Sequence, residues 1–301
     1  MTLCNGEMGA EPAFPTLQQA PRQRSAVFAL ILPAVLVVAA LLVGPMVLLA
    51  RISLNQYSAT QLMIEATTAQ NYLNALADPY YRGVMGTTLV MAFTCTALTL
   101  ALGFPAAYRL ARMESRWKSL VIVLTLIPLL VGNVVRAAGW LGLLGNDGLI
   151  NATLRGLHIT SQPLQLIYTP GAVAVGTIAV VLPYMILTLS SVIESIPRAV
   201  EEAAANLGAG AFTVFRRVVW PLALPGTVAG CVLVFILCMN TYATAVLLGG
   251  SQFKMMAPAV YDQFSKGMNW PFGAALAFIL LAATLVLTVL GTALLGRRYA
   301  R

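Results

Sequence analysis

The sequence is poor in charged residues. Only 18 basic and 10 acidic residues occur among 301, so charged side chains make up 9% of the chain, against about 25% in typical soluble domains. Hydrophobic residues make up 59%. Six stretches have no Lys, Arg, Asp or Glu: residues 25–50, 83–108, 119–135, 156–193, 218–253 and 267–296. Five of them exceed the roughly 20 residues that cross a bilayer as a helix, which excludes a soluble protein and predicts a multispanning membrane protein.

Residues that carry metal or hydrolytic chemistry are also scarce. The chain has one histidine, His158, and four cysteines, and they form no cluster with the spacing of a metal site. The sequence contains no His-Glu-x-x-His motif, no paired carboxylates in the hydrophobic stretches and no G-x-x-x-x-G-K-[ST] phosphate loop. These absences argue against a membrane-embedded enzyme and against an ATPase. Cys95, Cys231 and Cys238 are interpreted as small apolar packing residues.

The excess of basic residues has two possible meanings. A net charge of +8 suits either a nucleic-acid surface or the basic loops that orient a membrane protein. With six spans and a cytoplasmic N-terminus, the cytoplasmic side holds Arg22, Arg24, Arg109, Arg112, Arg116, Lys118, Arg198, Arg216, Arg217, Arg297, Arg298 and Arg301. The other side holds Arg51, Arg82, Arg136, Arg155, Lys254 and Lys266. This two-to-one bias follows the positive-inside rule, so we expect both termini in the cytoplasm and no nucleic-acid partner.

These patterns predict an all-α polytopic membrane protein with six transmembrane helices. Residues 1–24 are polar and contain three prolines, and we expect a flexible cytoplasmic tail there. Residues 25–301 form the predicted transmembrane domain. Its expected spans are residues 26–50, 84–108, 119–142, 171–193, 222–248 and 272–295. Residues 143–170 begin with a turn signal and continue with leucines at near-helical spacing, which predicts a short external amphipathic helix.

The most informative segment is the predicted cytoplasmic loop at residues 194–221. Glu201 and Glu202 lie early in an expected helix, where the helix dipole favours carboxylates. Gly208 follows that helix and suits the left-handed conformation that often ends one. A second helix then leads to Pro221. The loop is therefore expected to be a helix-turn-helix hairpin that protrudes into the cytoplasm.

This loop resembles a known motif. The run Glu202-Ala203-Ala204, with Gly208 six positions after the glutamate and Pro221 at the end, is similar to the EAA loop of ATP-binding-cassette importer permeases. The sequence departs from that pattern at Trp220, where leucine is usual. The resemblance implies a type I importer permease fold in which the hairpin couples the membrane helices to an ATPase. The implied coupling residues are Glu201, Glu202, Ala203, Ala204, Gly208 and Pro221.

The resemblance also implies partners and a location. The expected partners are a cytoplasmic ATP-binding-cassette ATPase dimer, a second permease subunit that is a paralogue of this one, and a periplasmic solute-binding protein. The ATPase would bind ATP and Mg, so this chain would carry no cofactor and would be a transport subunit rather than an enzyme. The expected location is the bacterial inner membrane.

A weaker similarity extends over about residues 70–300. It includes Gly139-Trp140-Leu141, Asn146–Asn151, Leu182-Pro183-Tyr184, Leu247–Gly250, Asp262-Gln263-Phe264 and Trp270–Gly273. Together these segments resemble permeases that import putrescine and spermidine, and most of all the first of their two membrane subunits. Permeases for ferric iron, phosphonates or opines share much of this pattern and are alternatives.

Polar residues inside the expected spans are candidates for the substrate path. Tyr184 lies in the fourth span, and Asn240 and Thr244 lie in the fifth. Because they are four residues apart, Asn240 and Thr244 are expected on one face of a continuous helix. Hydrogen bonding between helices is the alternative role for such residues. A secondary transporter is the more remote alternative function, since the spans offer no acidic residue for ion coupling and no inverted repeat.

Overall fold

The computed structural model describes residues 22–58, 60 and 62–296. The chain divides into two units, one up to Leu49 and one from Ala50 onward. Residues 1–21 of the expected tail lie outside the described residues, and Arg22 begins the first helix, α1 (Arg22–Ser53).

The described residues of the first unit all belong to α1. This helix contains Pro33 and Pro45 without a break, and its part from Ile31 to Ser53 has a mean hydropathy of 2.7. Its large apolar side chains from Ile31 to Leu48 are exposed. A helix that is apolar on all sides is suited to lipid, so α1 meets the requirements of the first expected span.

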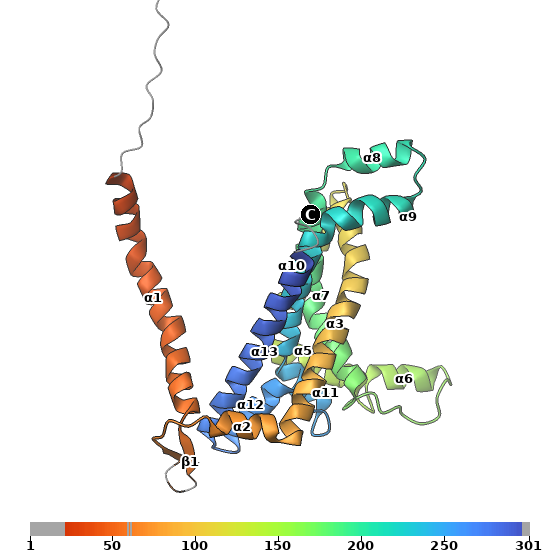
Figure 1. Cartoon of the computed structure of the whole chain (residues 1–301). Coiled ribbons are helices and arrows are strands. Elements are labelled where there is room, and N and C mark those ends of the chain that lie inside the picture. The colour runs from red at the N-terminus through yellow and green to blue at the C-terminus, as the bar shows by residue number, and fades with distance from the viewer. Residues whose placement is uncertain (1–21, 59, 61, 297–301) are drawn as a thin grey trace, which may run out of the picture. The chain divides into compact units, whose positions relative to one another are not determined.

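The second unit is built around four long helices. They are α3 (Pro79–Ala111), α7 (Pro170–Glu194), α10 (Trp220–Met239) and α13 (Trp270–Gly296), and they run side by side in Figure 1. Small residues allow close packing between them. A Cβ atom at Gly103 of α3 would overlap Met185 of α7, and one at Gly226 of α10 would overlap Val192.

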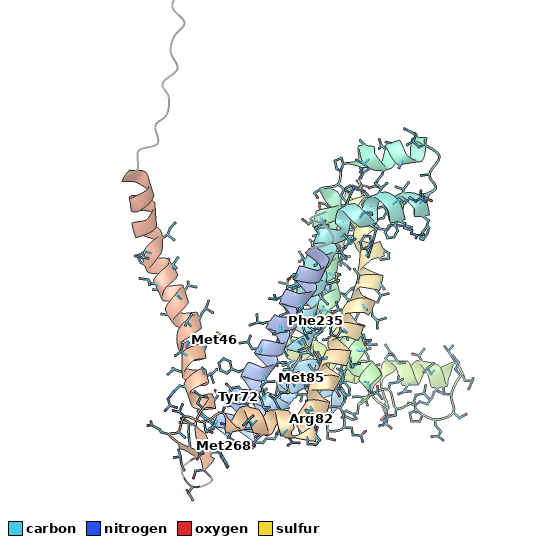
Figure 2. All side chains as sticks on the ribbon, in the orientation of Figure 1. Met46, Tyr72, Arg82, Met85, Phe235 and Met268 are labelled. Carbon is cyan, nitrogen blue, oxygen red and sulfur yellow. The ribbon has the colours of Figure 1, made fainter. Side chains whose placement is uncertain are left out.

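Buried small and apolar side chains fill the space between these helices. Cys95 of α3 and Cys238 of α10 are fully buried and belong to the hydrophobic core, as the packing interpretation predicted. Phe235 of α10 packs with Phe93 of α3 at a ring distance of 4.9 Å, and Figure 2 shows Phe235 and Met85 within this bundle.

Shorter elements lie at the two ends of the bundle. One end carries α8 (Arg198–Asn206), α9 (Ala211–Val214) and a π-helical turn, η1 (Phe215–Val219). The opposite end carries α2 (Gln70–Ala77), α6 (Leu149–Gly156), α11 (Ala243–Gly249), α12 (Met256–Ser265) and the hairpin of β1 (Gln56–Ser58) and β2 (Leu62–Ile64) (Figure 1). The two strands are antiparallel, with Gln56 opposite Ile64, and they are a small addition to the expected all-α fold.

Two expected spans are not continuous helices. The third, residues 119–142, is broken between α4 (Trp117–Leu130) and α5 (Asn133–Leu144), and the helical segments on either side are bent by 96°. Val131 and Gly132 take extended backbone conformations there. The amphipathic helix expected after this span is present as α6.

The fifth expected span, residues 222–248, ends early. Helix α10 stops at Met239, and α11 begins at Ala243. The Asn240 amide donates to the Ile236 carbonyl at 2.9 Å, and the Thr241 hydroxyl donates to the Leu237 carbonyl at 3.2 Å. The Asn240 backbone amide also donates to the Ile236 carbonyl, at 3.3 Å, so side-chain and backbone donors together close the end of α10. The helix therefore ends where these polar residues begin, whereas the expected span continued through them to residue 248.

Five described helices are long and apolar enough to cross a membrane, and the bent segment that begins with α4 makes a sixth if it counts as one span. Counted that way, the described residues match the expected number of spans, with the third bent and the fifth shortened at the end that leads to α11.

Candidate coupling hairpin and translocation path

The segment between α7 and α10 forms the expected hairpin. Helix α8 ends at Asn206, and Gly208 has a φ of +84°, a backbone conformation that residues with a Cβ rarely adopt. The amides of Gly208 and Ala209 donate to the carbonyls of Ala205 and Ala204 at 2.9 and 3.1 Å, which closes the end of α8. The predicted helix end at Gly208 is confirmed.

The far side of the hairpin is open to solvent. Leu207 is 89% exposed and Phe212 is 74% exposed, and Glu202 and Ala203 are exposed as well. Among the described residues Glu202 has no ion-pair partner. Leu207, Phe212 and Glu202 therefore make this side of the hairpin a candidate surface for binding another protein.

Glu201 points the other way. Its carboxylate forms an ion pair with Arg112, which follows the last turn of α3, and the side chains of Glu201 and Arg112 are only 14% and 15% exposed. The Tyr108 hydroxyl of α3 donates to the second carboxylate oxygen of Glu201 at 2.8 Å. The sequence placed Glu201 and Glu202 together as coupling residues, and the structure separates them: Glu201 contacts the end of α3, and Glu202 is exposed to solvent.

Further polar contacts join the start of the hairpin to the loop after α3. Arg112 donates to the Ile196 carbonyl at 3.1 Å, and Arg198 donates to the Arg112 carbonyl at 2.8 Å. Arg198 also pairs with Glu114. Lys118 of α4 pairs with Glu194 of α7 at 2.9 Å. The loop after α3 and the hairpin therefore lie on the same side of the bundle.

The end of the hairpin is held by aromatic packing. Phe104 of α3 lies 5.3 Å from Phe215 and 5.2 Å from Trp220, measured between ring centroids. The Trp220 amide donates to the Phe215 carbonyl across the π-helical turn, and Pro221 lies in the first turn of α10. Trp220, which departs from the usual leucine, thus adds a ring to the packing against α3.

The three candidate path residues lie in different settings. Asn240 follows the end of α10 and lines a cavity of about 380 Å³ with residues of α12 and α13. Thr244 is buried in α11, where its methyl group lies close to Gly176 of α7. Tyr184 is half-buried on α7. Because α10 and α11 are separate helices, the expectation that Asn240 and Thr244 share one helical face is wrong.

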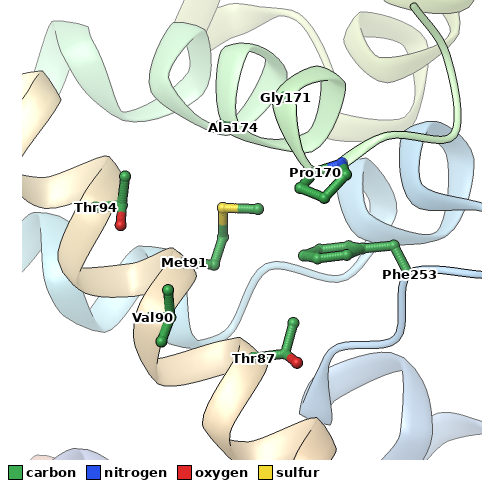
Figure 3. Close-up of a pocket in the computed structure, with 8 residues that line it drawn as sticks. All are labelled: Thr87, Val90, Met91, Thr94, Pro170, Gly171, Ala174 and Phe253. Carbon is green, nitrogen blue, oxygen red and sulfur yellow. The ribbon is translucent and has the colours of Figure 1, made fainter. Parts of the chain in front are cut away.

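A cavity that the sequence did not reveal lies between α3 and the start of α7. It measures about 520 Å³ and is lined by Thr87, Val90, Met91, Thr94, Pro170, Gly171, Ala174 and Phe253. Figure 3 shows the Met91 side chain and the Phe253 ring pointing into the same space. The spacing of Thr87 and Thr94, seven residues apart on one face of a helix, was a signal for it. Phe253 follows α11, far from both helices in sequence, and could not have been placed there.

Comparison with known proteins agrees with this architecture. The permease protein PotB of the spermidine/putrescine transport system of Haemophilus influenzae is 33% identical over 234 residues, which cover 77% of this chain and 82% of the relative. PotB of Escherichia coli is 34% identical and covers 71% of this chain and 77% of the relative. A molybdenum transport system permease, ModB of Mycobacterium bovis, is 30% identical over 66% of the chain and 74% of the relative.

The fold also matches a solved transporter. A chain of the bacterial alginate ABC transporter, solved in complex with its oligosaccharide-bound periplasmic protein, superposes with a TM-score of 0.74 at 17% identity, and the match covers 93% of this chain and 96% of that one. The model of the binding-protein-dependent transport system inner membrane component matches residues 99–300. The chain therefore belongs to this family of inner membrane components and is a permease subunit of an ABC importer.

Proposed function

We propose that this permease imports polyamines such as putrescine and spermidine. The observation that carries the proposal is the 33% identity to a spermidine/putrescine permease across 82% of that relative's length. The solute would arrive on a periplasmic binding protein. The channel would form between this chain and a second permease subunit that is a paralogue.

The hairpin of α8 and α9 is the proposed contact with a cytoplasmic ATPase dimer. Exposed Glu202, Leu207 and Phe212 offer one carboxylate and two apolar side chains, and such a helix can lie in a groove of a partner. Ala203 and Ala204 allow the two backbones to approach closely. With this contact the α8 end of the bundle would lie in the cytoplasm, and we propose that both termini lie there as well.

ATP and Mg would bind to the ATPase and not to this chain, which is a transport component and not an enzyme. The absence of a phosphate-cradling glycine loop from the whole sequence supports this division.

Transport by the reconstituted complex tests the solute. Labelled putrescine and spermidine should enter proteoliposomes in an ATP-dependent manner when the binding protein is supplied. Molybdate, ferric ion, phosphonates and opines serve as competitors, and a complex whose ATPase lacks its phosphate-loop lysine is the control. Uptake of one of these competitors in place of polyamines would contradict the polyamine proposal and leave the importer assignment intact.

A further inference from the structure

Both ends of the hairpin are attached to the same helix. At its start, Glu201 contacts Arg112 and Tyr108 at the end of α3. At its end, Phe215 and Trp220 pack on Phe104, also near the end of α3. The hairpin is covalently continuous with α7 and α10, yet its non-covalent anchor is α3, which is not adjacent to it in sequence.

We propose that Glu201 is a positioning residue and that, with Arg112 and Tyr108, it forms a latch through which α3 moves together with the hairpin. The proposal rests on the coupling role proposed above for the hairpin. It assigns the two neighbouring glutamates different tasks, because Glu202 faces the ATPase and Glu201 faces the membrane helices.

The chemistry of the latch suits a rigid connection. Hydrogen bonds between charged groups are roughly twice as strong as neutral ones, and the Glu201 carboxylate receives one from Arg112 and another from Tyr108. The pair is largely shielded from solvent, so salt screens it less than an exposed pair. Arg112 also donates to the Ile196 carbonyl, which fixes its guanidinium at the turn that leads into α8.

Without the latch the start of α8 would have few contacts with the membrane helices. Only the short turn Ser195-Ile196-Pro197 connects it to α7, and the contacts of Arg198 with the Arg112 carbonyl and with Glu114 are both exposed. A push on α8 would then bend this turn and fail to displace a membrane helix. The latch converts such a push into movement of α3.

Helix α3 leads from the latch toward the cavity of Figure 3. It is one helix from Pro79 to Ala111, unbroken at Pro105, and it supplies Thr87, Met91 and Thr94 to that cavity. Nearby, the Thr88 hydroxyl accepts a hydrogen bond from the Met256 amide of α12 at 2.8 Å. A displacement of α3 at the hairpin therefore reaches a cavity wall and a contact with the opposite end of the bundle.

The test compares the two glutamates in the reconstituted complex. Glu201→Gln and Arg112→Gln should retain the ATPase and its hydrolysis, while solute taken up per ATP hydrolysed falls. The fall should be about 2- to 30-fold, which is the range by which single residues change coupling between sites. Glu202→Lys should instead weaken retention of the ATPase. A purely structural role for Glu201 would lower the amount of assembled complex and leave uptake per ATP unchanged.

Two further variants guard against a folding artefact. Tyr108→Phe removes a single hydroxyl and should lower uptake per ATP by a smaller factor. The exchange Glu201→Arg with Arg112→Glu should recover uptake relative to either single reversal. Unchanged uptake per ATP in Glu201→Gln, Arg112→Gln and Tyr108→Phe would overturn the latch, and so would loss of ATPase retention in Glu201→Gln equal to that in Glu202→Lys. If Glu202→Lys and Leu207→Asp both retain the ATPase normally, the coupling role of the hairpin itself fails.

Discussion

The two ends of the bundle are fastened by different chemistry. At the α8 end, ion pairs such as Arg112 with Glu201 and Arg198 with Glu114 join segments that are far apart in sequence. At the opposite end, the ion pairs are local, for example Lys266 with Asp262, and buried amides make the long connections. The Asn71 side chain donates to the carbonyls of Ser53 and Asn55, both at 2.8 Å.

The difference shows how each end can respond. An amide held by backbone groups has one arrangement that satisfies it, so it fixes the segments that it joins. Exposed ion pairs such as Arg198 with Glu114 allow some sliding before they break, whereas the shielded contact of Glu201 keeps α8 and α3 together. The α8 end is therefore suited to movement with a partner, and the opposite end to holding a shape.

The largest expected effect concerns Gly208. Gly208→Val places a β-branched side chain at a φ of +84°, which should cost about 1 to 3 kcal/mol locally and redirect the hairpin. We expect normal insertion of the permease and loss of ATPase co-purification and of solute-stimulated hydrolysis. Gly210→Val is the matched control, because Gly210 has a φ of −67° and open space around it. Equal behaviour of the two variants would show that the turn conformation is unimportant.

The sequence predicted this hairpin well because its signals are local. A glycine after a short helix, early glutamates and a closing proline depend only on neighbouring residues. It could not separate Glu201 from Glu202, because the side of α8 that meets the bundle depends on Arg112, about ninety residues earlier in the chain. The break after Leu130 was missed for a related reason, since the apolar run continues through Val131 and only packing decides the bend.

At the opposite end, Asn151 should be the most sensitive position. It is fully buried, donates to the carbonyls of Gly145 and Leu164, and accepts from the Leu164 amide at 2.9 Å. Asn151→Leu would leave these backbone groups unpaired and destabilise the segment by about 1 to 3 kcal/mol. Limited proteolysis of residues 143–170 should become faster. As a control, Asn146 is exposed, and Asn146→Ser should leave the rate of proteolysis unchanged. Equal rates of proteolysis in the two variants would contradict the interpretation that buried amides hold the shape of this end.

A smaller effect is expected at Asn240. Asn240→Leu removes the amide that caps α10 and changes the wall of the adjacent cavity. We expect reduced uptake with assembly and basal hydrolysis retained. Thr244 is buried against α7. The variant Thr244→Val should therefore change the stability of the permease and leave uptake by the assembled complex unchanged. The opposite pattern would place the path at Thr244.

The smallest effect is expected for the exposed ion pair at the opposite end. Asp262 raises the pKa of Lys266 through a hydrogen bond and charge attraction, so any stabilisation is complete below the unfolded pKa of the lysine and is lost as pH rises through the folded pKa. Because Lys266 is exposed and water screens the pair, Lys266→Gln should leave the thermal midpoint in detergent unchanged within error, from neutral pH into the alkaline range. Glu201→Gln, measured beside it near neutral pH, should lower the midpoint, because it removes a shielded charge and leaves Arg112 without its carboxylate. If the thermal midpoint falls equally in both variants, the ion pairs at the two ends contribute equally to stability.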